Sequence, residues 1–417
     1  MKNRPWRDFP GRMADRSIPS SALDRLVWHW LDSLEQGCLV LEEGGRHRTF
    51  GDPEDRSLYA RVEVCDPCFY RRLVLGGSLG AAEAYIQGHW KCDDLVALVR
   101  LFCRNVTLAS GMDRYPAWLV GPLRLADHHW RRNTTATSRR NIAAHYDLGN
   151  DFFSLFLDET LTYSCAVFPT PESTLQEASI AKFDLICRKL GLTPEDHLLE
   201  IGTGWGGFAL HAAQHFGCRI TTTTISRRQY DYVRERIRTA GLEGRVTVLL
   251  EDYRELRGTY DKLVSIEMIE AVGYRYFDTY FRVCSERLKP QGMMLLQAIV
   301  IPDQRFESYR RSVDFIQRYI FPGGCLPSVG AVCRSLGRAT DLRLFHLEDI
   351  TPHYAETLAH WRRRFRVNLD QVRHLGFTEE FIRLWEYYLC YCEGGFRERA
   401  IGDVQMVLIK PAYGLRR

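Results

Sequence analysis

The second half of the chain alternates short apolar runs with longer stretches in which apolar residues recur at helical spacing. Helices are expected near 227–240 and 276–288, between runs of strand length. Those runs predict strands at 197–202, 219–225, 246–251, 261–267 and 292–300. Because alternating strands and helices are typical of parallel strands joined by crossovers, we expect an α/β fold whose sheet is covered on both faces.

The pattern continues toward the end of the chain after an interruption. An insertion near 303–338 breaks the alternation, and Leu342–Leu347 then predicts a further strand. Two long helices are expected near 353–374 and 378–398, and the apolar segment Asp403–Lys410 predicts the last strand. The expected sheet therefore has seven strands, most of them parallel.

In the N-terminal part of the chain, short segments with the apolar spacing of strands are followed by segments with the apolar spacing of helices. Helical spacing appears in Ala81–Tyr85 and Asp93–Cys103. Short strands are expected before them, at Cys38–Leu41, His47–Phe50 and Leu58–Val64. We therefore expect a small mixed α+β domain over 22–130. A basic, polar linker at Arg131–Asn141 separates it from a second domain over 141–417.

Composition and charge exclude several classes of protein. Of the 417 residues, 45% are apolar and 26% are charged, which is typical of a globular protein and excludes wholesale disorder. The net charge of +4 is too small to indicate a nucleic-acid partner. Met1–Ser21 lacks the apolar core of a signal peptide, and no apolar run reaches the length of a membrane span. We therefore expect a cytoplasmic protein without a membrane-spanning helix.

Basic clusters and cysteines narrow the choice of partners. The clusters at 131–132, 139–140 and 362–366 fit either a solvated face or contact with anionic lipid head groups. Thirteen cysteines in a chain without a signal segment indicate reduced thiols. Cys65 and Cys68 have the spacing of half a zinc site, but no matching second pair follows, so no metal is expected.

A glycine-rich turn follows the first expected strand of the sheet, within the segment Glu200–Gly207. Glycines let the backbone bend sharply and approach a ligand, and the following helix offers free N–H groups at its start. An NAD site also needs an acid at the end of the next strand, about 20 residues on. The segment 219–226 has no acid, so NAD is the weaker cofactor alternative. Acids instead end the first strand, at Glu200, and the third, at Asp252, which resembles the S-adenosylmethionine site of Rossmann-like methyltransferases.

Several motifs in a fixed order resemble those of the cyclopropane-fatty-acyl-phospholipid synthase family. They are His145–Asp158, Leu161–Phe168, Glu200–Gly207, Ile225–Gln229, Glu251–Arg254, Ile266–Gly273, Phe315–Gly324, His353–Tyr354 with Trp361, and Tyr391–Arg397. The resemblance implies a Rossmann-like methyltransferase fold and transfer of a methylene group from S-adenosylmethionine to a cis double bond of an unsaturated phospholipid acyl chain, forming a cyclopropane. It further implies an enzyme peripheral at the inner face of the membrane, whose N-terminal domain serves lipid docking or homodimer formation.

The same resemblance assigns the cofactor contacts. Tyr163 and Ser164 flank the methionine end, and Asp252 and Tyr253 face the adenine. Glu200 ends the strand before the loop. The loop itself is formed by Gly202, Gly204, Trp205 and Gly206, and the ribose side by Thr224, Ser226 and Gln229.

A bound bicarbonate is implied as the base that takes the final proton. Its holders are Cys165, Glu270, the backbone of Ile299, and Tyr354. A glutamate that holds an anion must carry or share a proton, so we expect a raised pKa at Glu270.

Two positions depart from the family pattern. Gln297 stands where the fifth strand usually has histidine, and Glu267 stands where a small residue is usual. Glutamine can donate a hydrogen bond to an anion but cannot take a proton. The departures leave the use of bicarbonate open, and with it a methyl- or methylene-branched product instead of a ring.

Two further features belong to the expected acyl pocket. Cys392 lies among tyrosines and is expected to line the pocket; a nucleophile is not needed, because the alkene attacks the cofactor directly. The insertion near 303–338 mixes arginines with aromatic residues, which favours a lid over the acyl chain. Methylation of a soluble hydrophobic small molecule is the alternative from another substrate class. A non-catalytic membrane-associated binding protein is a third, against which the intact glycine loop argues.

Overall fold

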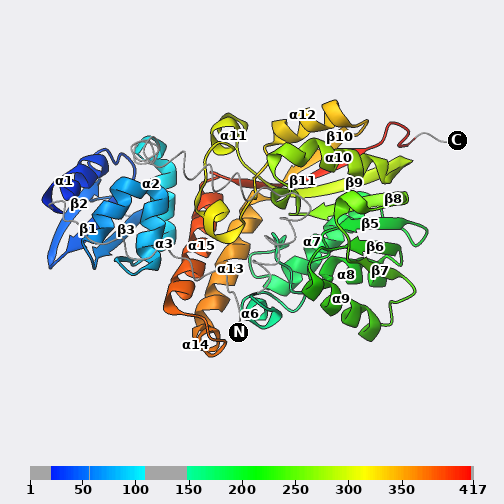
Figure 1. Ribbon diagram of the computed structural model, residues 1–417, viewed down its shortest axis with the longest axis horizontal. Helices are drawn as coiled ribbons and strands as arrows, with labels where there is room; N and C mark the ends of the chain where they lie inside the picture. Colours follow the sequence, from blue (N-terminus) through cyan, green and yellow to red (C-terminus); the bar gives the residue numbers. More distant parts are fainter. Residues whose placement is uncertain (1–19, 56, 109–147, 415–417) are drawn as a thin grey trace. The chain divides into compact units, whose positions relative to one another are not determined.

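A computed structural model gives the fold of the chain, and it describes residues 20–55, 57–108 and 148–414 (Figure 1). Contacts divide the chain into two compact units. Of the described residues, the first unit takes those in 20–108, 312–320 and 366–398, and the second takes the others. The expected linker at Arg131–Asn141 lies outside the described residues.

A small mixed sheet forms the centre of the first unit. Its strands are β1 (Cys38–Glu43), β2 (Arg46–Gly51), β3 (Tyr59–Val64) and β4 (Trp90–Cys92), in the order β2-β1-β3-β4. Gly44 and Gly45, with φ of 56° and 78°, form the tight turn that lets β1 and β2 pair as an antiparallel hairpin. β3 runs parallel to β1, as a mixed sheet requires. The three strands expected from the sequence are confirmed.

Helices from distant parts of the chain complete the first unit. They are α1 (Ser20–Leu31), α2 (Cys68–Ile86), α3 (Leu95–Arg104), α14 (Leu369–His374), α15 (Glu379–Arg397) and a π-helical turn at Ile316–Ile320. α15 packs on α3 and α2. A Cβ at Gly394 would lie 2.6 Å from Cγ1 of Val99, so only glycine allows this approach. Contacts therefore place α15 with the N-terminal segment, whereas sequence order had grouped residues 378–398 with the second domain.

The second unit is built on a seven-stranded sheet. Its strands are β5 (His197–Ile201), β6 (Arg219–Thr223), β7 (Val246–Leu249), β8 (Tyr260–Ile266), β9 (Leu288–Val300), β10 (Arg343–Asp349) and β11 (Gly402–Ile409). Their order is β10-β11-β9-β8-β5-β6-β7. The strands from β5 to β9 pair in parallel, and β11 pairs antiparallel with both β9 and β10. The expected α/β class and mostly parallel seven-stranded sheet are confirmed.

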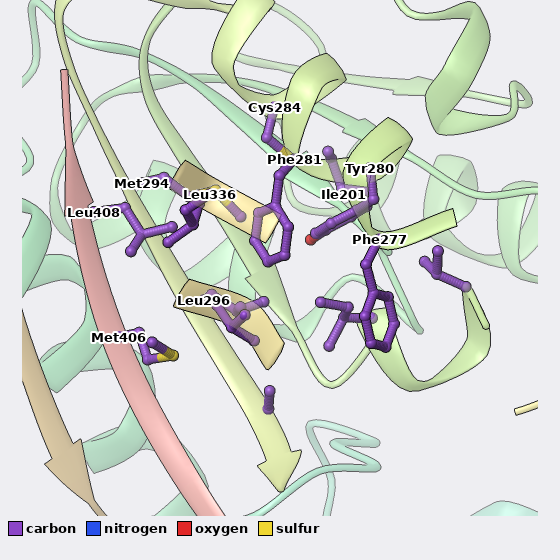
Figure 2. Packing of buried hydrophobic residues seen from close by; sticks show 14 of the residues in the cluster. Ile201, Phe277, Tyr280, Phe281, Cys284, Met294, Leu296, Leu336, Met406 and Leu408 are labelled. Atoms are coloured by element: carbon purple, nitrogen blue, oxygen red, sulfur yellow. The ribbon is translucent and has the colours of Figure 1, made fainter. Parts of the chain in front are cut away.

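Helices cover both faces of this sheet, so its central strands carry apolar side chains on both sides (Figure 1). Along β9, Met294 and Leu296 face one core cluster, while Met293 and Leu295 face the other. Figure 2 shows Met294 and Leu296 packed beside Phe281 of α10 (Phe277–Glu286) and Leu336 of α12 (Val329–Ala339). The opposite cluster is covered by α7 (Leu175–Leu190), α8 (Gly207–His215) and α9 (Arg227–Thr239).

Local signals in the sequence fix the ends of α7. The hydroxyl of Thr174 accepts from the backbone N–H of Glu177, and the Glu177 carboxylate accepts from the N–H of Thr174, forming a capping box. Gly191, with φ of 58°, ends the helix in the left-handed conformation. The remaining helices of the second unit are α6 (Asn150–Ser154), α11 (Asp303–Tyr309) and α13 (Thr351–Val367).

The insertion expected near 303–338 divides into parts with different surroundings. α12 buries Val332 and Leu336 in the sheet core, so this part covers the sheet. The π-helical turn at 316–320 belongs to the first unit. A role as a lid stays a prediction for the residues before α12. None of the helices in the described ranges combines the length and apolarity needed to cross a bilayer.

Candidate active site

The glycine loop joins β5 to α8 at the carboxyl edge of the parallel strands, where α/β sheets bind ligands. Gly202, Gly204 and Gly206 have φ of 100°, 53° and 83°, which residues with a Cβ rarely adopt. The backbone N–H groups of Gly202 and Thr203 both donate to the carbonyl of Thr223, which ties the loop to the end of β6. The Thr203 hydroxyl is buried and has no hydrogen-bond partner among the described residues.

Glu200 lies at the base of this loop and is 2% exposed. Its carboxylate accepts a hydrogen bond from the Thr222 hydroxyl at 2.5 Å. Burial raises the pKa of Glu200 to about 8, although Thr222 and the charge of Lys182 act in the opposite direction. Glu200 is therefore mainly a neutral acid at pH 7 when no ligand is bound.

The three residues assigned to the ribose side meet after β6. The Thr224 hydroxyl donates to the Gln229 side-chain oxygen at 2.7 Å, and the Ser226 hydroxyl accepts from the Gln229 N–H at the start of α9. All three are buried. The network holds polar side chains beside the loop where an acid would stand in a dinucleotide site.

Asp252 and Tyr253 follow β7 and are held by the next residue. The Asp252 carboxylate, 2% exposed, takes two hydrogen bonds from the Arg254 guanidinium, at 2.8 and 2.7 Å. The Tyr253 ring packs edge-on against Tyr280, with centroids 5.5 Å apart. Asp252 is therefore engaged by Arg254, and its contact to an adenine stays a prediction.

Aromatic side chains cluster beside the loop. The Trp205 indole is 3% exposed, donates to the Asn150 side-chain oxygen at 2.9 Å, and packs against Phe153 with centroids 4.9 Å apart. Tyr163 stacks on Trp361 at 5.2 Å and lies 5.4 Å from Phe153. Trp205 thus anchors the loop to α6 while contributing to a continuous aromatic wall.

A lysine without solvent contact lies next to the residue assigned to the methionine end. The Lys182 ammonium, on α7, donates to the Ser164 hydroxyl at 2.7 Å, and the side chain is completely buried. Burial lowers the pKa of Lys182, and the negative charges of Glu267 and Asp158 counteract that shift. Lys182 is the positive counterpart of a group of buried acids.

Glu267 is the centre of that acid group. Its Oε1 accepts from the backbone N–H of Cys165 at 2.8 Å and from Nε2 of Gln297 at 2.8 Å. Its Oε2 accepts from the Tyr354 hydroxyl at 2.6 Å. Glu267 has φ of 48°, a conformation that favours glycine, directly after β8. Three elements thus aim donors at one carboxylate.

Glu270 and Asp403 lie beside it. Oε1 of Glu270 accepts from the backbone N–H of Ile299 at 2.6 Å, which brings together two of the residues that the resemblance assigns to the bicarbonate site. Burial and the neighbouring Glu267 raise the pKa of Glu270 to about 8, which confirms the raised pKa expected there. Burial raises the pKa of Asp403 as well, and Oδ1 of Asp403 and Oε2 of Glu270 have no hydrogen-bond partner among the described residues. Glu270 is therefore mainly a neutral acid at pH 7.

The two candidate cysteines differ in their surroundings. Cys165 is buried in the second unit, and burial raises the pKa of its thiol, so it contributes its backbone N–H and not a thiolate. Cys392 lies on α15, which contacts assign to the first unit. Burial raises the pKa of the Cys392 thiol too, which agrees with a non-nucleophilic residue.

Sequence reasoning missed Lys182 and Asp403. Both interrupt an otherwise apolar pattern: Lys182 falls in the buried stripe of α7 between Ser179 and Phe183, and Asp403 begins the apolar strand β11. A charge at a core position is costly unless it is paired, so each interruption was a usable signal.

Comparison with known proteins adds to this geometry. Residues 133–406 match the family model described as mycolic acid cyclopropane synthetase. The chain is 41% identical to tuberculostearic acid methyltransferase of Mycobacterium tuberculosis over 347 residues, covering 82% of this chain and 81% of the relative. It is 37% identical to cyclopropane-fatty-acyl-phospholipid synthase of Escherichia coli over 351 residues, covering 84% and 87%.

Solved structures agree with these relatives. A mycolic acid cyclopropane synthase complexed with SAH and CTAB matches with a TM-score of 0.61 and 34% identity, covering 65% of this chain and 98% of that one. A cyclopropane synthase from Mycobacterium tuberculosis matches with the same TM-score and 32% identity. The chain therefore belongs to the mycolic acid cyclopropane synthetase family and is an S-adenosylmethionine-dependent C-methyltransferase.

Proposed function

We propose that the enzyme transfers the methyl carbon of S-adenosylmethionine to a cis double bond of an unsaturated phospholipid acyl chain and closes a cyclopropane ring. The observation that carries this proposal is the position of an aromatic wall and a buried acid cluster beside one glycine loop. An alkene is a weak nucleophile, so its attack requires a dry site and shelter for the positive charge that forms.

The loop residues fit the cofactor. Three glycines at positive φ keep the backbone free of Cβ atoms, and the buried, unpartnered hydroxyl of Thr203 offers a polar contact. Thr224, Ser226 and Gln229 supply further polar groups on the side assigned to the ribose. When bound, S-adenosylmethionine supplies an electrophilic methyl group.

The aromatic wall supports the carbocation step. Tyr163, Trp361, Phe153 and Trp205 present ring faces and edges to one another within 5.5 Å between centroids. Aromatic faces attract a cation electrostatically and exclude water that would trap it as an alcohol. The acid cluster at Glu267 then stands ready to take the proton lost on ring closure.

The inner membrane surface is the proposed place of action. Phospholipid acyl chains reside in bilayers, and transfer of the methyl group requires the acyl chain to reach the buried site. All thirteen cysteines are free thiols, which is typical of a reducing compartment. We assign the small N-terminal unit to lipid docking or homodimer formation in this setting.

A second product is favoured by two observations. The acid at Glu267 departs from the family pattern, and the relative at 41% identity is named a methyltransferase, not a cyclopropane synthase. If a hydride shifts from the methyl-bearing carbon to the neighbouring cation before the proton leaves, loss of a methyl proton gives a methylene branch. Methyl transfer to the alkene and formation of the cation would be the same for both products, which differ only after that step.

The test uses purified full-length protein, S-adenosylmethionine and vesicles of a cis-monounsaturated phospholipid. Released fatty esters are analysed by mass spectrometry before and after hydrogenation. A one-carbon gain that hydrogenation leaves unchanged, with ring fragments, supports cyclopropane formation. A gain that takes up hydrogen identifies the methylene product, and saturated phospholipid vesicles serve as the control. Absence of any gain, with cofactor still bound, would contradict a lipid substrate.

A further inference from the structure

The donors assigned to a bicarbonate ion are engaged by carboxyl groups of the chain itself. The Cys165 N–H and the Tyr354 hydroxyl both donate to Glu267, and the Ile299 N–H donates to Glu270. Gln297, at the position where histidine is usual, also donates to Glu267. A carboxylate offers the same paired oxygens as bicarbonate, so Glu267 replaces the ion in shape and in charge.

Bicarbonate does not fit beside these groups. An incoming anion would have to compete with Glu267 for the Cys165 N–H and the Tyr354 hydroxyl while lying next to its charge. Burial and the charge of Glu267 already raise the pKa of the neighbouring Glu270 and Asp403, and a second anion in this buried site would meet the same like-charge repulsion. The chain therefore lacks the cradle that the family resemblance implies.

We propose that the Glu267 carboxylate is the proton acceptor of the reaction and that this enzyme works without bicarbonate. The inference rests on the proposed methyl transfer to an alkene. After the new C–C bond forms, the cation loses a proton from the added methyl group to Glu267. The electrons of that C–H bond become the last C–C bond of the ring, and Glu267 becomes a neutral acid. The proton is later released to solvent, and the balance needs no further reactant.

The surroundings of Glu267 suit this role from every side. Lys182 from α7 supplies a positive charge, and donors come from Cys165, Gln297 on β9, and Tyr354 on α13. Glu270, in the turn after β8, accepts one hydrogen bond from the Ile299 N–H, and Asp403, on β11, accepts one from Nε2 of Gln297 at 3.3 Å, whereas Glu267 accepts three. Burial raises the pKa of Glu267, while its three donors and Lys182 lower it. Among the three acids Glu267 is the one built to hold the charge, with a basicity above that of an exposed glutamate.

The backbone conformation of this residue is also unusual, shared among the described non-glycine residues only by Leu161 and Arg399. Glu267 adopts φ of 48°, where a side chain with a Cβ is disfavoured, and its N–H donates to the Gln297 carbonyl. A strained non-glycine residue that persists at a site is typical of a functional constraint. The same strain makes Glu267→Gly an informative variant. Glycine adopts this positive φ without strain, and the substitution leaves only the space of the removed side chain.

The first experiment measures the full-length enzyme in CO2-free buffer and during bicarbonate titration. We expect the rate of one-carbon gain in phospholipid vesicles to be the same with and without bicarbonate. Glu267→Gln should lower this rate by about 10²–10⁴-fold, the typical contribution of a general base. Glu286→Gln, at the exposed end of α10, is the matched control and should retain the wild-type rate.

The second experiment restores the missing acceptor from outside. Glu267→Gly should lose activity in CO2-free buffer and regain it in proportion to added bicarbonate or formate. Bicarbonate alone should raise the melting temperature of Glu267→Gly and leave that of the wild type unchanged, which reports binding without turnover. The pH profile of the rescued variant should follow the added acid and differ between bicarbonate and formate.

Contrary outcomes are distinct. A wild-type enzyme that slows when bicarbonate is removed and recovers when it returns would overturn the inference while leaving methyl transfer intact. A Glu267→Gly variant that keeps the wild-type rate in CO2-free buffer would overturn it as well. If the wild type forms no one-carbon product under any condition, the proposed function fails first.

Discussion

The glycine loop and the acid cluster lie at the same edge of the sheet but are built in opposite ways. In the loop the backbone forms the site, and glycines at 202, 204 and 206 are close in sequence. In the cluster, side chains form the site, and Glu267 is bound by residues 102, 30 and 87 positions away. A site formed by the backbone of residues close in sequence can therefore be recognised as a sequence motif. A network of charged side chains from distant segments cannot, because it depends on which strands become neighbours.

Removal of the buried lysine should break the acid cluster most strongly. Lys182→Met leaves Glu267 without its positive neighbour, so we expect the free energy of unfolding to fall by about 3–5 kcal/mol. Urea denaturation at pH 7 measures the change. Lys289→Met is the matched control, because its ion pair with Asp261 lies at the surface, with 47% and 28% of the two side chains exposed, and surface pairs are worth about 1 kcal/mol or less.

The same experiment has an internal check. Addition of Glu267→Gln to Lys182→Met removes the uncompensated charge, so the double variant should recover part of the lost stability. Equal losses in Lys182→Met and Lys289→Met would contradict the assignment of Lys182 as the counter-charge of the cluster.

The free energy of unfolding should depend on pH through Glu200, the acid at the base of the loop. Burial raises the pKa of Glu200 to about 8 from an ordinary value of 4.5, so folding favours the neutral form. Its stabilising contribution is complete below pH 4.5 and is lost as pH rises toward 8. We expect the wild type to lose on the order of 2–4 kcal/mol more than Glu200→Gln between pH 5 and 8. Denaturant titrations at several pH values measure both slopes, and parallel slopes would refute the prediction.

Substitutions within the loop should separate backbone strain from contact. At Gly202, with φ of 100°, an added Cβ would lie 3.2 Å from Cγ of Met268. We expect Gly202→Ala to cost about 1–3 kcal/mol and to weaken S-adenosylmethionine binding. Gly204→Ala, at φ of 53° with open space around its Cβ, should cost about 1 kcal/mol. Calorimetric titration with the cofactor measures the loss of affinity in each variant. A larger loss of affinity in Gly204→Ala than in Gly202→Ala would contradict this prediction.

Much of the fold follows from the sequence for physical reasons. The central strands of the large sheet are buried on both faces, so they appear as short apolar runs that periodicity detects, as in β9 and β11. Helix ends are fixed by local signals such as the Thr174 capping box. The assignment of α15 to the first unit could not be predicted, because it depends on Gly394 meeting Val99 across a large separation in sequence.

The contacts of the site can also be separated into those that the sequence could predict and those that it could not. The proximity of Ile299 to Glu270 follows from their positions at the ends of the neighbouring strands β9 and β8, and that of Thr224 to Gln229 from the short turn between β6 and α9. The hydrogen bond from the Tyr354 hydroxyl to Glu267 could not be predicted, because the direction of the Glu267 side chain depends on the positive φ of that residue. Asp252 illustrates a further limit, because its bond to Arg254 depends on a side-chain rotamer.

The pairing of Arg100 with Glu398 at 2.7 Å, 298 positions apart, also constrains the order in which the protein can fold during synthesis. The first unit needs α15 to cover α3, so it cannot be completed until the ribosome has made nearly the entire chain. During that interval the apolar faces of α2 and α3 have no native cover from α15. Truncation before residue 366 would make this exposure permanent, so neither unit can be isolated by a single cut in the chain.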